Sequence, residues 1–300
     1  MEVYLGLKAG IRGSVRAGEM LGAHTTWRVG GPADFFVEPA AVEDLRFVLR
    51  FTAERGLPLT VMGNGSNLLV SDAGLRGVVV RMGTGMDRVG LDGNIILAQG
   101  GVRLSRLVRT AQASGLGGLE FMAGIPASLG GAVVMNAGAN GLCMGDRVEE
   151  VTVVDRSGTV ERRAVSQLGF RYRWSNIQAG PEIVTAVALR CFPKDKNEIG
   201  REIERFLNRR RETQPLDQPS AGCVFKNPPG DSAGRLIEAA GGKGLRVGGA
   251  TVSRKHANFV LNTGGATARD ILELIRQIRQ LVGDRFGIEL GLEVKLMGDF

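Results

Sequence analysis

The chain has few of the residues that mark a disulfide framework, a metal cluster or a nucleic-acid surface. Three cysteines, Cys143, Cys191 and Cys223, are scattered over 300 residues without a Cys-x-x-Cys spacing. This pattern excludes a disulfide framework and a cysteine-based metal site. Aromatic residues make up only 5% of the chain, so stacking platforms for bases are scarce despite the net charge of +7. We therefore expect phosphorylated small molecules, and no nucleic acid, as partners.

Long hydrophobic runs are also absent. The first twenty residues carry Lys8, Arg12 and Arg16 without the apolar core of a signal peptide. No segment approaches the roughly 18 apolar residues that a membrane span needs. These absences predict a soluble, cytoplasmic protein that has no membrane partner.

Glycine is the residue in excess, because the 45 glycines are about twice the usual share of roughly 7%. Backbone must therefore approach backbone or ligand closely in many places. Helical spacing of apolar residues over 41–55, 102–113 and 199–211, and after Thr267, is mixed with short strands and a hairpin at 148–165. The mixture predicts an α+β protein, with the charged stretch PKDKNE linking a larger N-terminal part to a smaller C-terminal one.

One glycine-rich segment, VMGNGSNLLV, follows a predicted strand. It contains Gly63, Asn64, Gly65, Ser66 and Asn67. Successive backbone N–H groups in such a segment can turn toward a pyrophosphate with no Cβ in the way. The segment lacks the third glycine of a Rossmann fingerprint and the Gly-Lys-Ser/Thr of a Walker loop. A tight turn between strands explains the same pattern, so this segment alone does not distinguish pyrophosphate binding from a structural turn.

A second segment, GIPASLGGAVVMNAGAN, places Pro126 where a helix could begin and then a series of small residues. A helix starting there would direct its N-terminal N–H groups at a phosphate. A helix packed tightly on its neighbour is the alternative. Two such segments on one chain favour dinucleotide binding without a classical motif, and flavin binding by a non-Rossmann fold fits best.

A series of motifs now resembles the UDP-N-acetylenolpyruvoylglucosamine reductase family, from about Leu21 to the C-terminus. The motifs are TTWRVGGPADFF, VMGNGSNLL, GIPASLGGAVVMNAGAN, FRYRWS, GCVFKNP, VGGATVSRKHANFVLN and ELGLEVKLMG. The resemblance implies an FAD-binding PCMH-type domain of the vanillyl-alcohol-oxidase fold at residues 1–195, in two subdomains with a boundary near residue 75. It also implies a smaller α+β substrate-binding domain at residues 196–300.

The family's reaction reduces the enolpyruvyl ether of a UDP-sugar to the lactyl ether of UDP-N-acetylmuramate for peptidoglycan. By resemblance, NADPH is the reductant and FAD the cofactor, and with only two histidines we expect a noncovalent FAD. Contacts to the cofactor are implied for Gly63, Asn64, Gly65, Ser66, Asn67, Gly124, Ile125, Ser128, Gly130, Gly131, Asn136, Gly138 and Arg211. Contacts to the substrate are implied for Tyr172, Gln214, Lys226 and Asn227.

The resemblance assigns Arg173 to stabilising the enolate that forms after hydride transfer. A guanidinium can hold the enolate's carboxylate in two parallel hydrogen bonds. In FRYRWS, however, Phe170, Tyr172 and Trp174 alternate with polar residues, as in a half-buried strand with a solvated face. The residues alone favour that structural reading.

Glu293 and Cys223 complete the implied active site. Glu293 lies on the polar face of the alternating segment GIELGLEVKLM, where most carboxylates are merely solvated. A lone cysteine is usually a small buried hydrophobe. The resemblance places Glu293 beside the intermediate and Cys223 at the position of the family's proton donor, often a serine. A thiol with a pKa of about 8.5 is mostly protonated at neutral pH and can deliver a proton to carbon.

One departure from the family concerns substrate closure. Larger members cover the nucleotide with a segment bearing a tyrosine, whereas this chain has only Tyr4 and Tyr172 and resembles the shorter subgroup. His256 and Asn258 resemble a motif of the family's substrate domain, although a strand histidine is more often structural. Two other functions stay open: a different flavin oxidase acting on a hydroxy acid or sugar, and a basic binding protein without catalysis.

Overall fold

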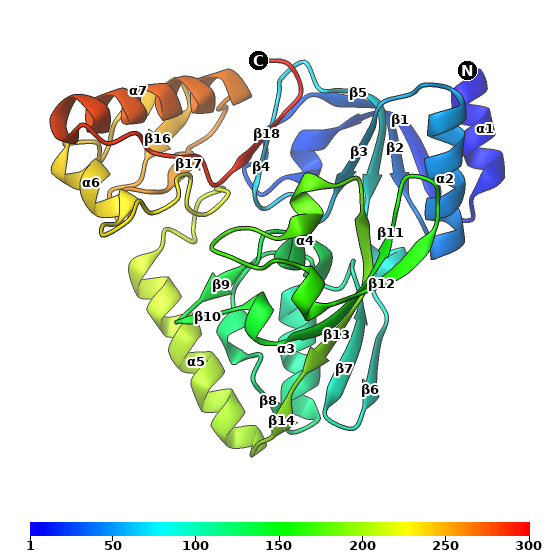
Figure 1. Cartoon of the computed structure of the whole chain (residues 1–300). Coiled ribbons are helices and arrows are strands. Elements are labelled where there is room, and N and C mark those ends of the chain that lie inside the picture. Colours follow the sequence, from blue (N-terminus) through cyan, green and yellow to red (C-terminus); the bar gives the residue numbers. More distant parts are fainter. The chain divides into compact units, whose positions relative to one another are not determined.

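Two N-terminal segments share a core with the C-terminal residues, and this interleaving organises the fold. The computed structural model describes residues 1–300. Its unit 1 consists of Met1–Ala17, Phe35–Asn64 and Gly77–Arg209, and its unit 2 of Gly18–Asp34, Gly65–Arg76 and Arg210–Phe300 (Figure 1). The resemblance predicts domains at residues 1–195 and 196–300, with a subdomain boundary near residue 75, and this division stays a prediction. The interleaving has a physical reason, because Trp27 and Leu69 are buried in one apolar cluster with C-terminal side chains.

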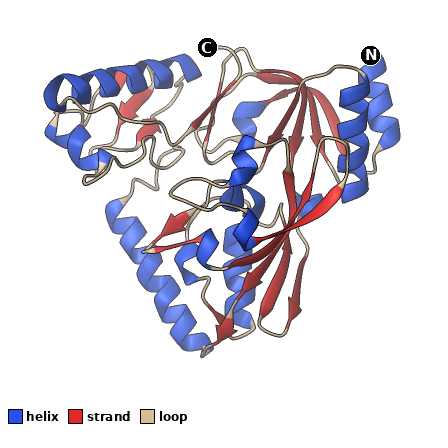
Figure 2. Ribbon diagram, viewed as in Figure 1, coloured by secondary structure: helices blue, strands red, loops and turns tan.

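A five-stranded antiparallel sheet in unit 1 has the strand order β12-β11-β13-β7-β6. Its strands are β6 (Val89–Asp92), β7 (Ile95–Gln99), β11 (Val148–Val154), β12 (Val160–Ala164) and β13 (Ile183–Arg190) (Figure 2). The predicted hairpin at 148–165 is thus confirmed as β11 and β12. Its turn is closed by the Asp155 carboxylate, which accepts the N–H groups of Ser157 and Thr159 at 2.8 and 3.0 Å.

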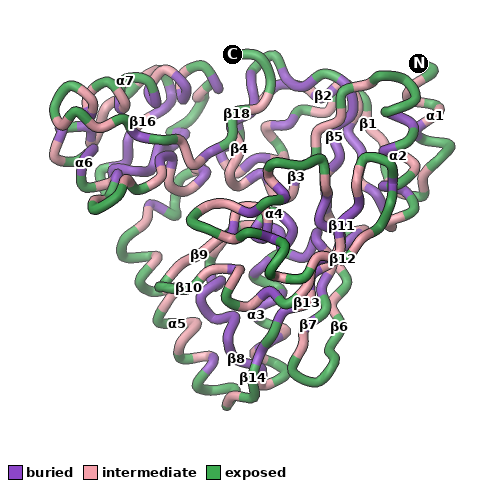
Figure 3. The backbone as a smooth tube through the Cα atoms, viewed as in Figure 1, coloured by how far each residue is buried: buried purple, intermediate pink, exposed green.

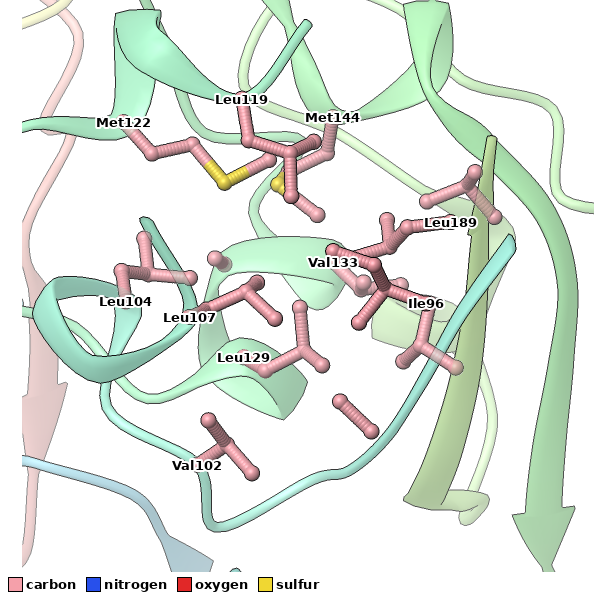
Figure 4. Close-up of a cluster of buried hydrophobic side chains, with 14 of the residues drawn as sticks. Ile96, Val102, Leu104, Leu107, Leu119, Met122, Leu129, Val133, Met144 and Leu189 are labelled. Atoms are coloured by element: carbon pink, nitrogen blue, oxygen red, sulfur yellow. The ribbon is translucent and has the colours of Figure 1, made fainter. Parts of the chain in front are cut away.

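Helices α3 (Leu104–Ala113) and α4 (Leu129–Val134) pack with this sheet. Figure 4 shows Val133 of α4 gathered with Ile96 of β7 and Leu189 of β13 in one apolar cluster. A start of α4 at Pro126, as predicted from the sequence, is wrong by about one turn. The helix begins after Ser128, whose hydroxyl oxygen accepts the Gly131 N–H at 3.4 Å as a conventional N-cap.

A second sheet, most of it in unit 1, has the order β1-β2-β5-β3, with β3 and β5 parallel. Its strands are β1 (Ser14–Met20), β2 (Pro32–Glu38), β3 (Leu59–Met62) and β5 (Leu75–Arg81). The predicted helix at 41–55 is confirmed as α2 (Val42–Glu54), which packs against α1 (Glu2–Gly10). A Cβ on Gly10 would lie 1.9 Å from Phe47 Cζ, so glycine permits this close approach.

Unit 2 combines two helices with short strands. The predicted long helix after Thr267 is confirmed as α7 (Ala268–Phe286), opened by a reciprocal capping box between Thr267 and Asp270. The buried residues of α7 recur every three or four positions and form one face, as in an amphipathic helix (Figure 3). The other elements are α6 (Ala233–Ala239), the sheet β15 (Arg246–Val247), β16 (Ala250–Val252) and β17 (Val260–Asn262), and the parallel pair β4 (Leu68–Val70) and β18 (Lys295–Met297).

The remaining elements are short, apart from α5. The charged stretch expected as a linker ends in α5, which begins at Lys196 and continues to Thr213. The short strands are β8 (Leu116–Gly117), β9 (Gly138–Ala139), β10 (Leu142–Cys143) and β14 (Phe192–Pro193), and the 3-10 turns η1 to η6 lie at 21–24, 84–86, 120–122, 144–146, 165–167 and 176–179. No helix combines the length and apolar character needed to cross a membrane.

Candidate functional site

The two glycine-rich segments predicted from the sequence lie against each other in unit 1. The Asn64 side-chain amide donates to the Pro126 carbonyl oxygen at 2.6 Å. A Cβ on Gly63 would lie 2.0 Å from Ser128 Oγ, which no side chain could tolerate without a shift. Segments far apart in the sequence therefore form one cradle, and glycine at position 63 permits their close approach.

The glycines around α4 differ in what they contact. Gly130 is buried, and a Cβ there would lie 3.2 Å from the Gly100 carbonyl oxygen, so its small size serves packing of α4 on the sheet. Gly124 and Gly131 are exposed, and Gly124 has a φ of +76°, which favours glycine. Gly138 lies in β9 against β10. The exposed glycines are those that a ligand could approach.

The rest of VMGNGSNLLV belongs to unit 2, because the units change between Asn64 and Gly65. Gly65 has a φ of +62°, and a Cβ there would lie 2.1 Å from the His24 carbonyl oxygen. Ser66 is half-buried. The Asn67 side-chain amide donates to the Glu293 carbonyl oxygen at 3.1 Å, so Asn67 holds a predicted catalytic segment in place.

Arg173 lies at the tip of a tight turn, and the strand expected for FRYRW is wrong. Arg171 and Trp174 exchange both backbone hydrogen bonds, at 3.1 and 3.0 Å, and close the turn around Tyr172 and Arg173. Arg173 has a φ of +55°, a left-handed conformation that costs a residue with a Cβ roughly 1–2 kcal/mol. Strain of this kind is concentrated at functional sites. The alternating sequence offered no glycine or asparagine to signal the turn.

Asn136, a predicted cofactor contact, uses both polar atoms of its side chain on the backbone. Its amide nitrogen donates to the Arg171 carbonyl oxygen at 3.0 Å, and its amide oxygen accepts the Gly145 N–H at 2.9 Å. The residue is buried and has a φ of +43°. Asn136 therefore braces the Arg173 turn.

Cys223 and Glu293 are brought together in unit 2. Cys223 forms an antiparallel bridge with Phe259, and no disulfide joins any of the cysteines. The neighbouring Val224 donates its N–H to the Asn258 carbonyl oxygen at 2.9 Å and accepts the Glu293 N–H at 2.8 Å. One residue thus links the two extended segments that carry the thiol and the carboxylate.

Asn258 supports this arrangement from the side. Its buried amide accepts the Phe225 N–H at 2.9 Å and donates to the Phe225 carbonyl oxygen at 2.8 Å. His256 Nδ1 accepts the Asn258 N–H at 3.3 Å, which requires an imidazole without a proton on Nδ1. Burial lowers the pKa of His256 and favours that neutral form. The sequence motif HANF drew attention to both residues without revealing this supporting role.

Two lysines, Lys226 and Lys295, lie close in sequence to Cys223 and Glu293. The Lys226 backbone N–H donates to the Gly291 carbonyl oxygen at 2.8 Å. Burial, and then the charge of Lys226, lowers the pKa of the Lys295 ammonium group. The two ammonium groups therefore repel each other, and an anion between them would relieve that repulsion. The Asn227 amide oxygen accepts the Ala233 N–H at 3.0 Å at the start of α6.

Arg210, for which the sequence motifs give no signal, is more enclosed than the predicted Arg211. Arg211 is exposed, and its carbonyl oxygen accepts a hydrogen bond from Lys255. Arg210 Nε and Gln214 Oε1 are buried without a hydrogen-bond partner, which is unusual for buried polar atoms. Burial lowers the pKa of Arg210, and the charge of Cys223 opposes that shift. The charges of the Arg210 guanidinium and of a Cys223 thiolate therefore attract each other.

Comparison with family models finds two matches. Residues 33–163 match the FAD binding domain, and residues 214–297 match the UDP-N-acetylenolpyruvoylglucosamine reductase C-terminal domain. A UDP-N-acetylenolpyruvoylglucosamine reductase of Desulforamulus reducens is 46% identical over 98% of this chain and 97% of its own. One of Moorella thermoacetica is 49% identical over 98% and 96%.

Comparison with solved structures finds similarity to the same family. The UDP-N-acetylenolpyruvylglucosamine reductase of Thermus caldophilus aligns with a TM-score of 0.83 and 40% identity, over 96% of this chain and 100% of that one. The BBE-like 1 protein of Physcomitrella patens aligns with a TM-score of 0.50 and 18% identity, over 64% of this chain and 44% of that one. The second likeness concerns the fold alone.

Proposed function

Because the chain belongs to the UDP-N-acetylenolpyruvoylglucosamine reductase family, we propose that its glycine-rich segments bind the flavin and that Cys223 is the proton donor. The protein is an FAD-dependent oxidoreductase of peptidoglycan precursor synthesis, with NADPH as the reductant. The predicted α+β fold of the vanillyl-alcohol-oxidase type is confirmed. The single observation that carries the assignment of roles is the link of Cys223 and Glu293 through Val224. A basic binding protein without catalysis is excluded by family membership.

The cradle of unit 1 fits the cofactor. Gly63 and Asn64 lie against the second segment, whose exposed glycines Gly124 and Gly131 leave their backbone accessible to a pyrophosphate. Gly65 and Ser66, which follow in the same sequence motif, stay predicted cofactor contacts. When bound, FAD supplies a hydride from N5 to the terminal carbon of the enolpyruvyl double bond.

Arg173 has the task of stabilising the negative charge that then develops on the substrate. Its guanidinium donates two parallel hydrogen bonds to the enolate's carboxylate, which lowers the barrier because the charge is largest in the transition state. Tyr172 is 54% exposed at the tip of the same turn and is available to the substrate. The strained backbone of Arg173 supports a functional role for the turn.

Cys223 delivers the proton to the remaining enolate carbon. Its sulfur–hydrogen bond breaks, a carbon–hydrogen bond forms, and the thiolate that remains is stabilised by the Arg210 guanidinium. Glu293, held beside Cys223 by the bonds to Val224, orients the intermediate. Lys226, Asn227 and Gln214 contact the anionic substrate, and Arg211 contacts the cofactor.

We also propose the setting of the reaction. The substrate is a UDP-sugar, and the positive balance of the chain suits this dianionic ligand. A cytoplasmic location and the absence of nucleic-acid partners remain predictions from composition.

Anaerobic reoxidation tests the function directly. The FAD-loaded protein is reduced with NADPH without oxygen, the enolpyruvyl UDP-sugar is added, and the flavin absorbance is followed. We expect rapid reoxidation with formation of the lactyl ether. A flavin that stays reduced would sink the reductase assignment. Reduction of the oxidised flavin by a hydroxy acid, or reoxidation of the reduced flavin by a keto acid alone, would favour another flavin oxidase.

A further inference from the structure

The turn that carries Arg173 is braced by a side chain from a later 3-10 turn. The Gln178 side-chain amide donates to the Arg173 carbonyl oxygen at 3.1 Å and to the Val134 carbonyl oxygen at 2.8 Å. Val134 is the last residue of α4, where carbonyl groups have no partner within the helix. A single amide therefore ties the peptide of Arg173 to the end of a buried helix.

Two further bonds anchor the same segment. Ser175, which is fully buried, donates its hydroxyl to the Val134 carbonyl oxygen at 2.8 Å. Asn136, two residues beyond Val134, holds the Arg171 carbonyl oxygen. The carbonyl groups of Arg171 and Arg173 are thus both held from the C-terminal end of α4.

This anchoring has a consequence for the geometry of the reaction. Helix α4 begins at Ser128 in the proposed flavin segment and ends at Val134, only six residues or about 9 Å later. These hydrogen bonds therefore fix the position of the Arg173 turn relative to the segment proposed to contact the cofactor. A side chain misplaced by about 1 Å can slow a reaction by roughly 10²-fold.

The backbone of Arg173 needs such a brace. With a φ of +55°, this residue lies in a region that arginine avoids in isolation, so the surrounding contacts must hold it there. The Gln178 amide holds the carbonyl oxygen of Arg173 itself. Without it, the turn is free to relax to an unstrained φ, and the guanidinium moves with it.

We propose that Gln178 is a positioning residue, whose amide locks the left-handed backbone of Arg173 and so aims its guanidinium at the substrate's carboxylate. The inference rests on the proposed function, because the role of Arg173 is itself part of that proposal.

The test measures the two half-reactions of the FAD-loaded protein in Gln178→Met, which keeps the length of the side chain and removes both donors. We expect reoxidation by the enolpyruvyl UDP-sugar to slow by about 10- to 100-fold, while reduction by NADPH stays within about 2-fold of wild type. In an Arg173→Ala background, adding Gln178→Met should change reoxidation by less than about 2-fold, because a residue that acts through Arg173 has nothing left to position.

A second variant and a control keep the test sharp. Gln178→Glu also lacks N–H donors, but its protonated acid regains one, so its deficit relative to wild type should shrink at low pH. Asn176→Ala is the matched control, because its amide donates to the Gln167 carbonyl oxygen on the same segment without touching the Arg173 turn. We expect wild-type half-reactions from it.

Several results would overturn the inference. Wild-type reoxidation in both Gln178 variants would do so, and so would an equal loss in both half-reactions or a full additional loss in the Arg173→Ala background. Loss of FAD from both Gln178 variants would indicate a purely structural role. By contrast, a wild-type flavin that the nucleotide fails to reoxidise overturns the proposed function itself, which separates the two failures.

Discussion

Arg173 and Cys223 are held in place by different kinds of contacts. The segment of Cys223 is paired through backbone groups, with Phe259 opposite and the N–H and C=O of Val224 both engaged. The turn of Arg173 is held in a left-handed conformation by the side-chain amides of Gln178 and Asn136. Backbone hydrogen bonds do not depend on which side chain the residue carries. Serine can therefore replace cysteine at position 223 without loss of the pairing. The turn instead depends on particular side chains around it.

The largest expected effect tests the thiol side of this comparison. Cys223→Ala should lower turnover by about 10²- to 10⁴-fold, the range of a lost general acid, with near-normal flavin reduction by NADPH. Cys223→Ser should keep substantial activity, because the backbone pairing places the hydroxyl where the sulfur was. Steady-state rates and anaerobic half-reactions measure this, with Cys143→Ser as a control. An alanine variant that turns over like wild type would make Cys223 structural.

The second prediction concerns Asn258, a side chain that supports the Cys223 segment. Asn258→Ala leaves the buried N–H and C=O of Phe225 without partners, at about 1–3 kcal/mol for each group. We expect the free energy of unfolding, measured with urea, to fall by about 2–4 kcal/mol. Gln277→Ala removes an exposed amide contact in the same unit and should change it by less than about 0.5 kcal/mol. A loss as small as the control's would show that backbone pairing alone holds the segment.

The third prediction isolates the strain of the turn. Arg173→Gly and Arg173→Ala should both lose reoxidation, but glycine accepts a φ of +55° without strain. The glycine variant should therefore be more stable than the alanine variant by about 1 kcal/mol, visible as a higher Tm. Equal melting temperatures would mean that the left-handed backbone carries little strain, and the contrast between the two sites would weaken.

The smallest expected effect is a pH dependence at His256. Burial lowers its pKa below the ordinary value of 6.5, so the unfolded chain binds a proton more readily than the folded one. The resulting contribution to stability is complete above pH 6.5 and is lost as the pH falls toward the folded pKa. Melting curves between pH 8 and 5.5 should show a smaller slope for His256→Asn than for wild type. If wild type and His256→Asn showed the same dependence of Tm on pH, His256 would not contribute to holding Asn258.

Local patterns in the sequence predicted the elements whose stabilising contacts are local. The apolar stripe and capping box of α7, the apolar spacing of α2 and the hairpin at 148–165 follow from neighbours along the chain. FRYRWS was misread as a strand, because its alternation is real but its turn is held by Gln178 and by the end of α4. Nothing in the six letters themselves encodes those partners.

The sequence by itself determined the family and the cofactor, because the motifs carry the resemblance, and it predicted the candidate site residues. Only the tertiary structure decided which of the candidate site segments are joined by hydrogen bonds. It divided VMGNGSNLLV between two units, placed Cys223 and Glu293 on either side of Val224, and assigned Asn136 to bracing a turn. The physical reason is that hydrogen bonds between residues distant in the chain form only when burial of the shared core brings those segments together.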